Sequence, residues 1–355
     1  MNESAHFDAE TSGVMSRWQR WAPALTLIVL APGIAEVSSG ATRLSFIFVF
    51  VSEMMVWGCG ALIIRELVRR WHAGWTSMLL LGLCLSIAEE FLIQQTSLAP
   101  LPWVAAPAYG RVWGVNLIYF LFMLGFESVL VVLVPVQLTE LIFPGRRREP
   151  WLKKSGLVIT SVVFALGSFD AWFLWIKIAR AKVLHVPPYN PPLLTLLAGV
   201  LMIAALSLAA YARRNADQRS ARLQSPTAAV SPWIVGIVTL LFGFPWYALM
   251  GLVFVPRHNL PLWVPVLATS IWATLAYLLA RWFSLSPGWS DFHRWSAVFC
   301  ASLVCMIAGF LGSSSWSRMD LVAKAILNIV SVAGLIWLAL KITRRSKQPS
   351  VDPKM

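Results

Sequence analysis

Long apolar runs separated by short polar and basic segments occupy most of the chain. One helix of about 20 apolar residues can cross the hydrocarbon core of a bilayer, and the pattern predicts about ten such helices. We place them at 20–37, 44–65, 75–95, 113–142, 156–178, 192–212, 232–255, 262–281, 296–315 and 321–342. Pro32 and Gly33 interrupt the first run, so we expect either a full span or a re-entrant segment there.

The expected fold class is all-α, a polytopic transmembrane bundle of about ten helices. A polar segment divides two membrane halves, the first of which carries most of the acidic residues within spans. In order, the parts are a tail at 1–19, a membrane half at 20–212, a flexible linker at 213–231, a second membrane half at 232–342 and a tail at 343–355.

Lys and Arg residues concentrate in alternate loops and in the C-terminal tail. Cytoplasmic loops carry an excess of such residues, so both termini are expected in the cytoplasm, which agrees with an even number of spans. We therefore expect a multi-pass protein of the bacterial cytoplasmic membrane. The polar first 17 residues are not typical of a cleaved signal peptide.

Composition agrees with a membrane protein: of the 355 residues 58% are hydrophobic and only 13% are charged. Many of the 19 Trp residues lie beside the ends of the runs, where an indole ring settles at headgroup level. The net charge of +13 lies in short loops, so it indicates topology, and we expect no nucleic-acid partner. The four Cys residues form no CxxC motif and are expected to be buried and inert.

No nucleotide-binding loop, GxSxG or HExxH motif appears, so we expect no cofactor and find no support for ATP-driven transport or the commoner hydrolases. The candidate chemistry instead lies in carboxylates within the spans. Such groups are costly in a bilayer and mark functional sites by default. They are Glu53, Glu89, Glu90, Glu127 and Asp170.

Helix geometry groups several of these residues. Gly82, Ser86, Glu90 and Gln94 recur at steps of four and form one polar stripe, while Asn116 shares a face with Glu127. We expect the glutamates to converge on one site in the outer half of the membrane. The candidate catalytic residues are Glu89, Glu90 and Glu127, and the candidate substrate- or ion-binding residues are Glu53, Ser86, Gln94 and Asn116; whether a metal binds is left open.

Crowded carboxylates in a low dielectric cannot all be ionised, so such a cluster can exchange protons, act as an acid or base, or bind a cation. The alternative is structural, with neutral Glu and Gln side chains bridging helices by hydrogen bonds. A third feature is the basic loop with Arg146, Arg147 and Arg148, expected to contact anionic lipid headgroups or another membrane protein.

Part of the chain resembles a family of uncharacterised bacterial multi-spanning membrane proteins, which has no established activity. The likeness covers roughly residues 36–152 and rests on the stretches "GALIIREL", "IAEEFLIQQTSLAP", "YGRVWGVNLIYF" and "VPVQLTELIFPGRRREPWL". It implies a membrane location and no specific reaction.

The adjacent Glu89 and Glu90 also resemble the glutamate pair of the CPBP intramembrane proteases, which process CAAX-type prenylated proteins and bacteriocins. That likeness implies Glu90 as general base on water and Glu89 as its partner. The chain departs from the family pattern, because Gln94 stands where an arginine belongs and Glu127 where a histidine belongs. Three hypotheses remain: a CPBP-like scaffold that has lost standard protease activity, a proton- or cation-coupled transporter, and a non-catalytic membrane factor.

Overall fold

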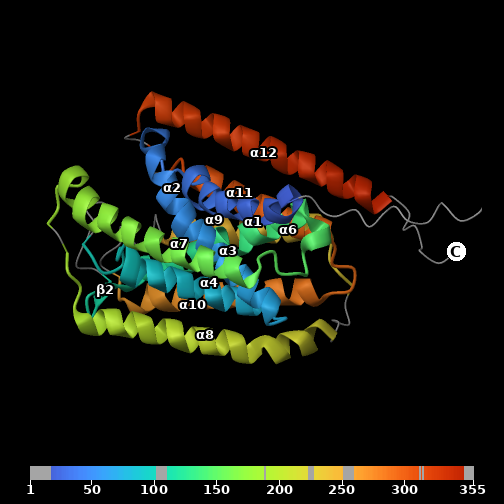
Figure 1. Ribbon diagram of the computed structural model, residues 1–355, viewed down its shortest axis with the longest axis horizontal. Coiled ribbons are helices and arrows are strands. Elements are labelled where there is room, and N and C mark those ends of the chain that lie inside the picture. Colours follow the sequence, from blue (N-terminus) through green and yellow to red (C-terminus); the bar gives the residue numbers. More distant parts are fainter. Residues whose placement is uncertain are drawn as a thin grey trace, which may run out of the picture.

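The structure is a computed structural model that describes residues 17–100, 110–187, 189–222, 228–250, 260–311, 313 and 316–347. Long helices lie side by side and form one bundle (Figure 1). Elements named η are 3₁₀ segments (η2, η6) or π-helical segments (η1, η3, η4, η5, η7). In chain order the elements are α1 (Arg17–Pro32), η1 (Gly33–Ser38), η2 (Leu44–Val49), α2 (Phe50–Glu53), η3 (Met54–Gly58), α3 (Cys59–Arg70), α4 (Trp75–Ala88), η4 (Glu89–Ile93), β1 (Arg111–Val112), β2 (Val115–Asn116), α5 (Leu117–Phe126), η5 (Glu127–Leu133), α6 (Val134–Ile142), η6 (Pro144–Arg146), α7 (Lys154–Trp172), η7 (Phe173–Val183), α8 (Leu193–Arg222), α9 (Pro232–Tyr247), α10 (Trp263–Leu285), α11 (Asp291–Ala308) and α12 (Arg318–Lys347).

The prediction of an all-α bundle is confirmed. Within the described residues, nine helices are long and apolar enough to cross a membrane. The predicted span at 296–315 corresponds to α11, which is not among the nine. Its first turn carries Asp291, His293 and Arg294, and these residues lower the hydropathy of an 18-residue helix.

The interrupted first run is one continuous helical rod, Trp18–Ser38, rather than a broken segment. The chain passes from α-helical to π-helical geometry after Pro32, and this wider turn accommodates the proline. The predicted flexible linker is in part helical, because α8 continues to Arg222.

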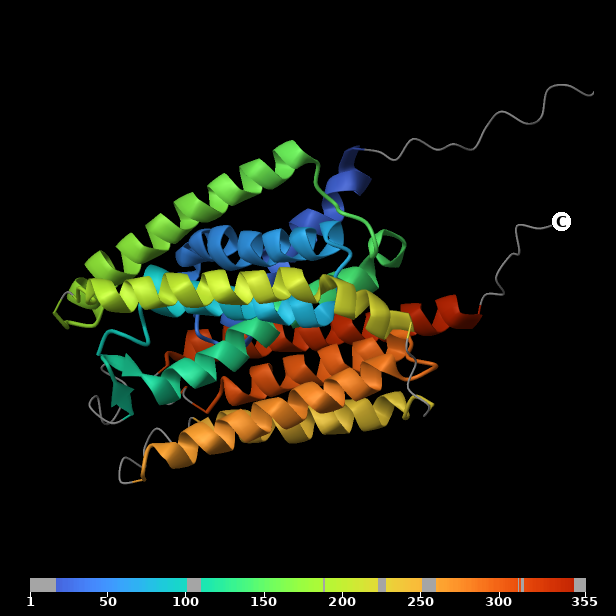
Figure 2. The ribbon, with the colours of Figure 1, turned by 90° about the horizontal axis from the view of Figure 1, so that it is seen from below.

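Apolar faces of the peripheral helices point outward, as expected of surfaces that contact lipid. In the most apolar stretch of α8 only 11% of the residues are buried, and the share is the same in α10. In the rod Trp75–Ile93 the share is 72%. α12 and α8 lie on opposite sides of the bundle (Figure 1), and α7 and α10 on another two (Figure 2). The rod of α4 and η4 is therefore a central element.

The first turn of α1 and the last turn of α12 lie at the same end of the bundle, and the hairpin of β1 and β2 lies at the opposite end (Figures 1 and 2). The hairpin is antiparallel, with Val112 opposite Val115. We call these the terminal end and the hairpin end. That the terminal end faces the cytoplasm stays a prediction.

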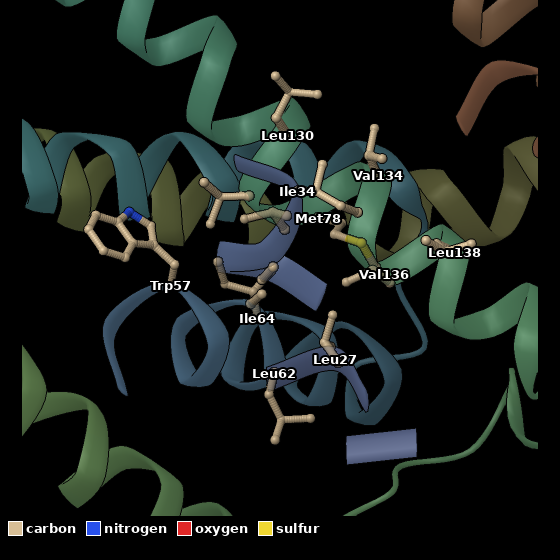
Figure 3. Close-up of a cluster of buried hydrophobic side chains, with 14 of the residues drawn as sticks. Leu27, Ile34, Trp57, Leu62, Ile64, Met78, Leu130, Val134, Val136 and Leu138 are labelled. Carbon is tan, nitrogen blue, oxygen red and sulfur yellow. The ribbon is translucent and has the colours of Figure 1, made fainter. Parts of the chain in front are cut away.

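The hydrophobic core joins α1, α3, α4, η5 and α6, and Figure 3 shows part of it, including Leu27, Leu62, Met78 and Val134. Glycine lets the inner rods approach closely. A Cβ atom on Gly58 would lie 2.9 Å from the carbonyl carbon of Ile28 in α1. Small residues at such crossings are typical of helices that pack within a membrane.

Candidate functional site

Four glutamates predicted to form a site are all buried in the bundle. The exposed fraction is 2% for Glu89, 0% for Glu90, 2% for Glu127 and 5% for Glu53. Glu89 and Glu90 lie in η4 on the central rod, and Glu127 begins η5, which packs against α4. All four residues predicted to form the site are thus buried in the structure.

The carboxylates are close enough to interact electrostatically with one another. Glu127 interacts with Glu89 and Glu90, and Glu89 also interacts with Glu36 of η1. Glu36 in turn interacts with Glu53. We call these five residues the acidic cluster; its inner part is Glu89, Glu90 and Glu127.

The inner part is held together by close packing of α4 on η5. A Cβ atom added to Gly82 would lie 3.2 Å from the Cα atom of Ser128, so a larger residue would push the two rods apart. Ser86, one turn later on α4, lies beside Glu127. The polar stripe predicted along α4, from Gly82 through Ser86 to Glu90, therefore faces η5, which begins with Glu127.

Every member of the acidic cluster lies on or next to a π-helical segment. Glu36 is in η1, Glu53 immediately precedes η3, Glu89 and Glu90 are in η4, and Glu127 begins η5. In η4 the amide of Gln94 donates to the Glu89 carbonyl at 3.0 Å, five residues back. Such wide turns change which residues share a face and are frequent at functional sites.

Glu90 has its own hydrogen-bond donors. The hydroxyl groups of Thr96 and Ser97 donate to Glu90 Oε2 at 2.7 and 2.5 Å. The chain turns back after η4 through Gln95, whose φ is +57°, and this turn carries both hydroxyls toward Glu90. Sequence reasoning missed the two residues because they follow the span, although they lie only six and seven positions after Glu90.

Asn116 supports this turn. Its backbone amide donates to the Ser97 carbonyl at 2.8 Å, and its side-chain oxygen accepts from the Tyr119 amide at 3.1 Å, which caps α5. Asn116 thus helps to position Ser97, and its role in substrate or ion binding stays a prediction. Gln94 is half-buried and follows the last residue of η4.

Several carboxylate oxygens of the cluster accept no hydrogen bond from the described residues. They are Glu89 Oε1 and Oε2, Glu90 Oε1, Glu127 Oε2 and Glu53 Oε2. Glu53 accepts through its other oxygen from the Thr42 hydroxyl. None of the ion pairs among the described residues involves a member of the cluster.

Two further residues were not predicted. Glu36 is partly buried and links Glu53 to the inner cluster. Lys324 of α12 is 4% exposed and donates to the carbonyl of Ser38, two residues after Glu36. The sequence does contain a signal for Lys324, because Asp320, Lys324 and Asn328 recur at steps of four and therefore share a helix face. The structure buries all three.

Asp170 is separate from the cluster. It is half-buried near the end of the peripheral helix α7 and accepts a hydrogen bond from the Ser52 hydroxyl. The described part of the chain contains no group of three or more His, Cys, Asp or Glu side chains arranged to hold a metal ion. Cys59, Cys84, Cys300 and Cys305 are buried free thiols.

A second group of buried charges lies at the terminal end, and each of its carboxylates pairs with arginine. Arg65 and Glu66 are 0% exposed and Glu140 is 1% exposed. Arg65 donates to Glu140 and Glu66 at 3.2 Å each and stacks on Trp151, with its guanidinium carbon 3.4 Å from the ring centroid. We call this the arginine cluster.

The arginine cluster holds the basic loop that was expected to contact lipid. The carbonyls of Arg146 and Arg147 accept from Arg65, the side chain of Arg146 pairs with Glu149, and that of Arg147 pairs with Asp291 at 2.8 Å. Of the three predicted lipid contacts, Arg148 is exposed. Arg146 and Arg147 are partly buried, and their ion pairs help to fix the loop; contact of the three arginines with lipid stays a prediction.

Comparison with protein-family models, with curated protein sequences and with solved structures finds no match to this chain. Function is therefore argued from the acidic cluster itself.

Proposed function

We propose that the protein is a proton- or cation-coupled transporter of the bacterial cytoplasmic membrane, with both termini in the cytoplasm, and that the inner acidic cluster is its coupling site. The observation that carries the proposal is that Glu89, Glu90 and Glu127, which are at most 2% exposed, have carboxylate oxygens without a hydrogen-bond partner among the described residues. The part of the chain that the structure describes also contains nine apolar helices long enough to cross a membrane, which supports the setting.

Three neighbouring carboxylates without a counter-ion cannot all carry charge. Transfer of one carboxylate from water to a protein interior costs several kcal/mol even after relaxation, and neighbouring negative charges add to that cost. A buried carboxylate is therefore neutralised by a proton or balanced by a cation. Uptake and release of that ion is the step that a coupled transporter needs.

The three residues differ in the charge state that their neighbours favour. Two hydroxyl donors stabilise a negative charge on Glu90, since hydrogen bonds to a carboxylate favour its ionised form. Both oxygens of Glu89 lack a donor among the described residues, so its neutral form costs least. We assign Glu90 as the carboxylate that is ionised more readily and Glu89 as the residue that gains and loses a proton.

Glu36 and Glu53 add two acidic residues to the inner cluster. η1 and α2, where they lie, are toward the hairpin end (Figure 1). Acidic residues toward this end fit access of ions from the side of the membrane opposite to the termini. This orientation rests on the predicted topology.

The protease hypothesis gains no catalytic partner from the structure. His293 lies at the start of α11, where its ring nitrogen accepts from the Ser290 amide in a capping box and its other nitrogen contacts the Val230 carbonyl. His72 and His185 lie where helices end. No described histidine takes part in the acidic cluster, so we do not propose proteolysis.

Carbodiimide labelling tests the site. Dicyclohexylcarbodiimide reacts with protonated carboxyl groups in apolar surroundings, and peptide mass spectrometry locates the product. We expect labelling of Glu89 that falls as pH rises. If the protein couples transport to a cation other than the proton, addition of that cation should suppress the labelling. Asp170→Asn should leave it unchanged, because Asp170 lies outside the cluster. A pH-independent result, or no labelling of Glu89, would contradict the assigned role.

Flux measurement tests the transport claim separately. Proteoliposomes that contain a pH-sensitive dye are subjected to an imposed proton or cation gradient. The wild-type protein should dissipate the gradient, and Glu89→Gln should slow the dissipation severalfold while Asp170→Asn does not. Labelling of Glu89 without flux would leave a proton-binding site but would refute transport of the ions tested.

A further inference from the structure

A pocket lies at the hairpin end between the turn after η1, the start of η2 and the start of α12. It shares no lining residue with the acidic cluster, although Thr42, which lines it, donates to Glu53. The pocket is shallow: it encloses about 10 Å³, roughly the room for one water molecule, and the rest of it opens outward. Its polar lining comes from Thr42, Arg43, Asp320 and Lys324, and Trp316 forms one wall.

The pocket lies where three candidate membrane helices end. Trp18–Ser38 ends beside it, Leu44–Arg70 begins in it, and Arg318–Lys347 begins beside it. In a bilayer, the ends of spanning helices and their Trp residues lie at the level of the lipid headgroups. A ligand in this pocket would therefore lie at headgroup depth.

One flank of the pocket is apolar and faces outward. Leu44, Ile47 and Leu327 line the pocket and are 42%, 42% and 41% exposed. Their side chains begin at the polar lining and continue along the outer faces of η2 and α12. The surface thus changes from cationic to apolar in the direction in which a lipid headgroup gives way to acyl chains.

Arg43 is prepared to bind an anion. Its guanidinium stacks on Trp316, 5.0 Å from the ring centroid, and donates no hydrogen bond to any described residue. A planar guanidinium held flat on an aromatic ring keeps its fork of N–H groups available for two oxygens of a phosphate.

The other charged groups of the pocket are already placed by the protein. Lys324 donates to the Ser38 carbonyl and faces the Phe310 ring at 4.7 Å, which holds its ammonium group at the pocket. Asp320 accepts from the amide and hydroxyl of Ser45 at 3.0 and 3.1 Å and from Ser317 at 2.9 Å. These donors satisfy the Asp320 carboxylate but leave its negative charge in place, so Arg43, Lys324 and Asp320 together present one net positive charge to a ligand.

Gly40 makes this arrangement sterically feasible. Its φ is +85°, and a Cβ atom there would lie 3.1 Å from Cζ3 of Trp316 and 3.2 Å from Cδ of Lys324. A side chain at this position would displace both residues. The local sequence thus allows the ring and the ammonium group to close on the backbone.

We propose that this pocket binds the headgroup phosphate of an anionic phospholipid, with Arg43 and Lys324 as its cationic contacts and Leu44, Ile47 and Leu327 along the acyl chains. A soluble anion would leave the apolar flank without a role. A zwitterionic lipid would bring its own cation next to Lys324, so phosphatidylglycerol should be preferred over phosphatidylcholine. This inference does not rest on the proposed transport activity.

Photo-crosslinking tests the site in the full chain. The protein is placed in phosphatidylcholine nanodiscs with a trace of photoactivatable phosphatidylglycerol or, in parallel, photoactivatable phosphatidylcholine. Crosslinked peptides are then mapped by mass spectrometry. We expect phosphatidylglycerol to label residues 37–47 and 316–327 more strongly than phosphatidylcholine does. Arg43→Gln should reduce that labelling about tenfold, as loss of one charge-assisted contact predicts.

Arg148→Gln, a change of an exposed arginine at the terminal end, is the matched control and should not alter labelling at the pocket. Lys324→Met gives a second reduction if the variant folds, and Arg43→Gln alone decides the test if it does not. Equal labelling by the two lipids, or labelling indifferent to Arg43, would overturn the proposal. Competition by millimolar inorganic phosphate would assign the pocket to a soluble anion and would also overturn it.

Discussion

Replacement of Arg65 by Met should destabilise the protein more than any single change among its partners. Arg65 is 0% exposed and donates hydrogen bonds to two carboxylates and to the carbonyls of Arg146, Arg147 and Glu149. Methionine retains an unbranched stem that can pack on Trp151 but supplies none of these donors. The change thus isolates the loss of the charge and its hydrogen bonds.

Removal of one partner from a buried ion pair costs about 3–5 kcal/mol. The structure places Arg65→Met near the lower limit, about 3 kcal/mol, because both carboxylates keep another cation: Glu140 pairs with Arg69 at 2.6 Å and Glu66 with Arg70 at 2.7 Å. Arg69→Met is the matched control. Its side chain is 19% exposed and Glu140 would keep Arg65, so we expect a smaller loss of about 1–2 kcal/mol.

The chain contains its own reporter for this comparison. Its four cysteines are buried free thiols, so they react with an alkylating dye only when the bundle opens. Reactivity followed against increasing sodium dodecyl sulfate in mild detergent gives the free energy of unfolding for each variant. Equal losses for Arg65→Met and Arg69→Met, or a loss below about 1 kcal/mol for Arg65→Met, would refute the reasoning from burial and hydrogen bonds.

Two further predictions use the same assay. Gly58→Ala should cost about 1–3 kcal/mol, because the new Cβ atom would lie 2.9 Å from the Ile28 backbone, and Gly145→Ala, which meets nothing within 4 Å, should be nearly neutral; equal effects would contradict the close packing of α1 on η3. Arg147→Gln should cost at most about 1 kcal/mol, since its pair with Asp291 is partly exposed, at 20% and 33%. A larger loss would show that this ion pair fixes the loop to α11 more firmly than its exposure indicates.

The sequence was sufficient to predict the helical bundle, because apolar runs of membrane-spanning length are a strong one-dimensional signal. It also singled out Glu89, Glu90 and Glu127, because charge within such a run is rare. The structure buries all three, and their role as a functional site stays a prediction. The run 296–315 was placed a few residues late: α11 begins at Asp291, where a capping box starts the helix within polar sequence.

Other parts of the site could not be predicted from helix periodicity. The sequence gives no sign that η4 is π-helical and that the chain leaves the helix after Ile93. Glu36 follows Pro32 and Gly33, which indicate an interrupted helix, so it was not counted among the acidic residues within spans. Glu90 accepts from Ser97, which lies in a turn that reverses the chain. Lys324 donates to Ser38, which is 286 residues away along the chain. No local sequence pattern encodes such contacts.

The contrast between the two buried charge groups bears on function. At the terminal end the chain pairs Glu66 and Glu140 with three arginines and leaves one carboxylate oxygen, Glu140 Oε2, without a partner. The acidic cluster has no such pairing among the described residues, although its inner part is as deeply buried as Glu66 and Glu140. If its glutamates served only to join helices, arginine or amide partners would stabilise them at lower cost. Retention of unpaired carboxylates at the centre, next to π-helical turns, is the arrangement expected where an ion must be bound and released.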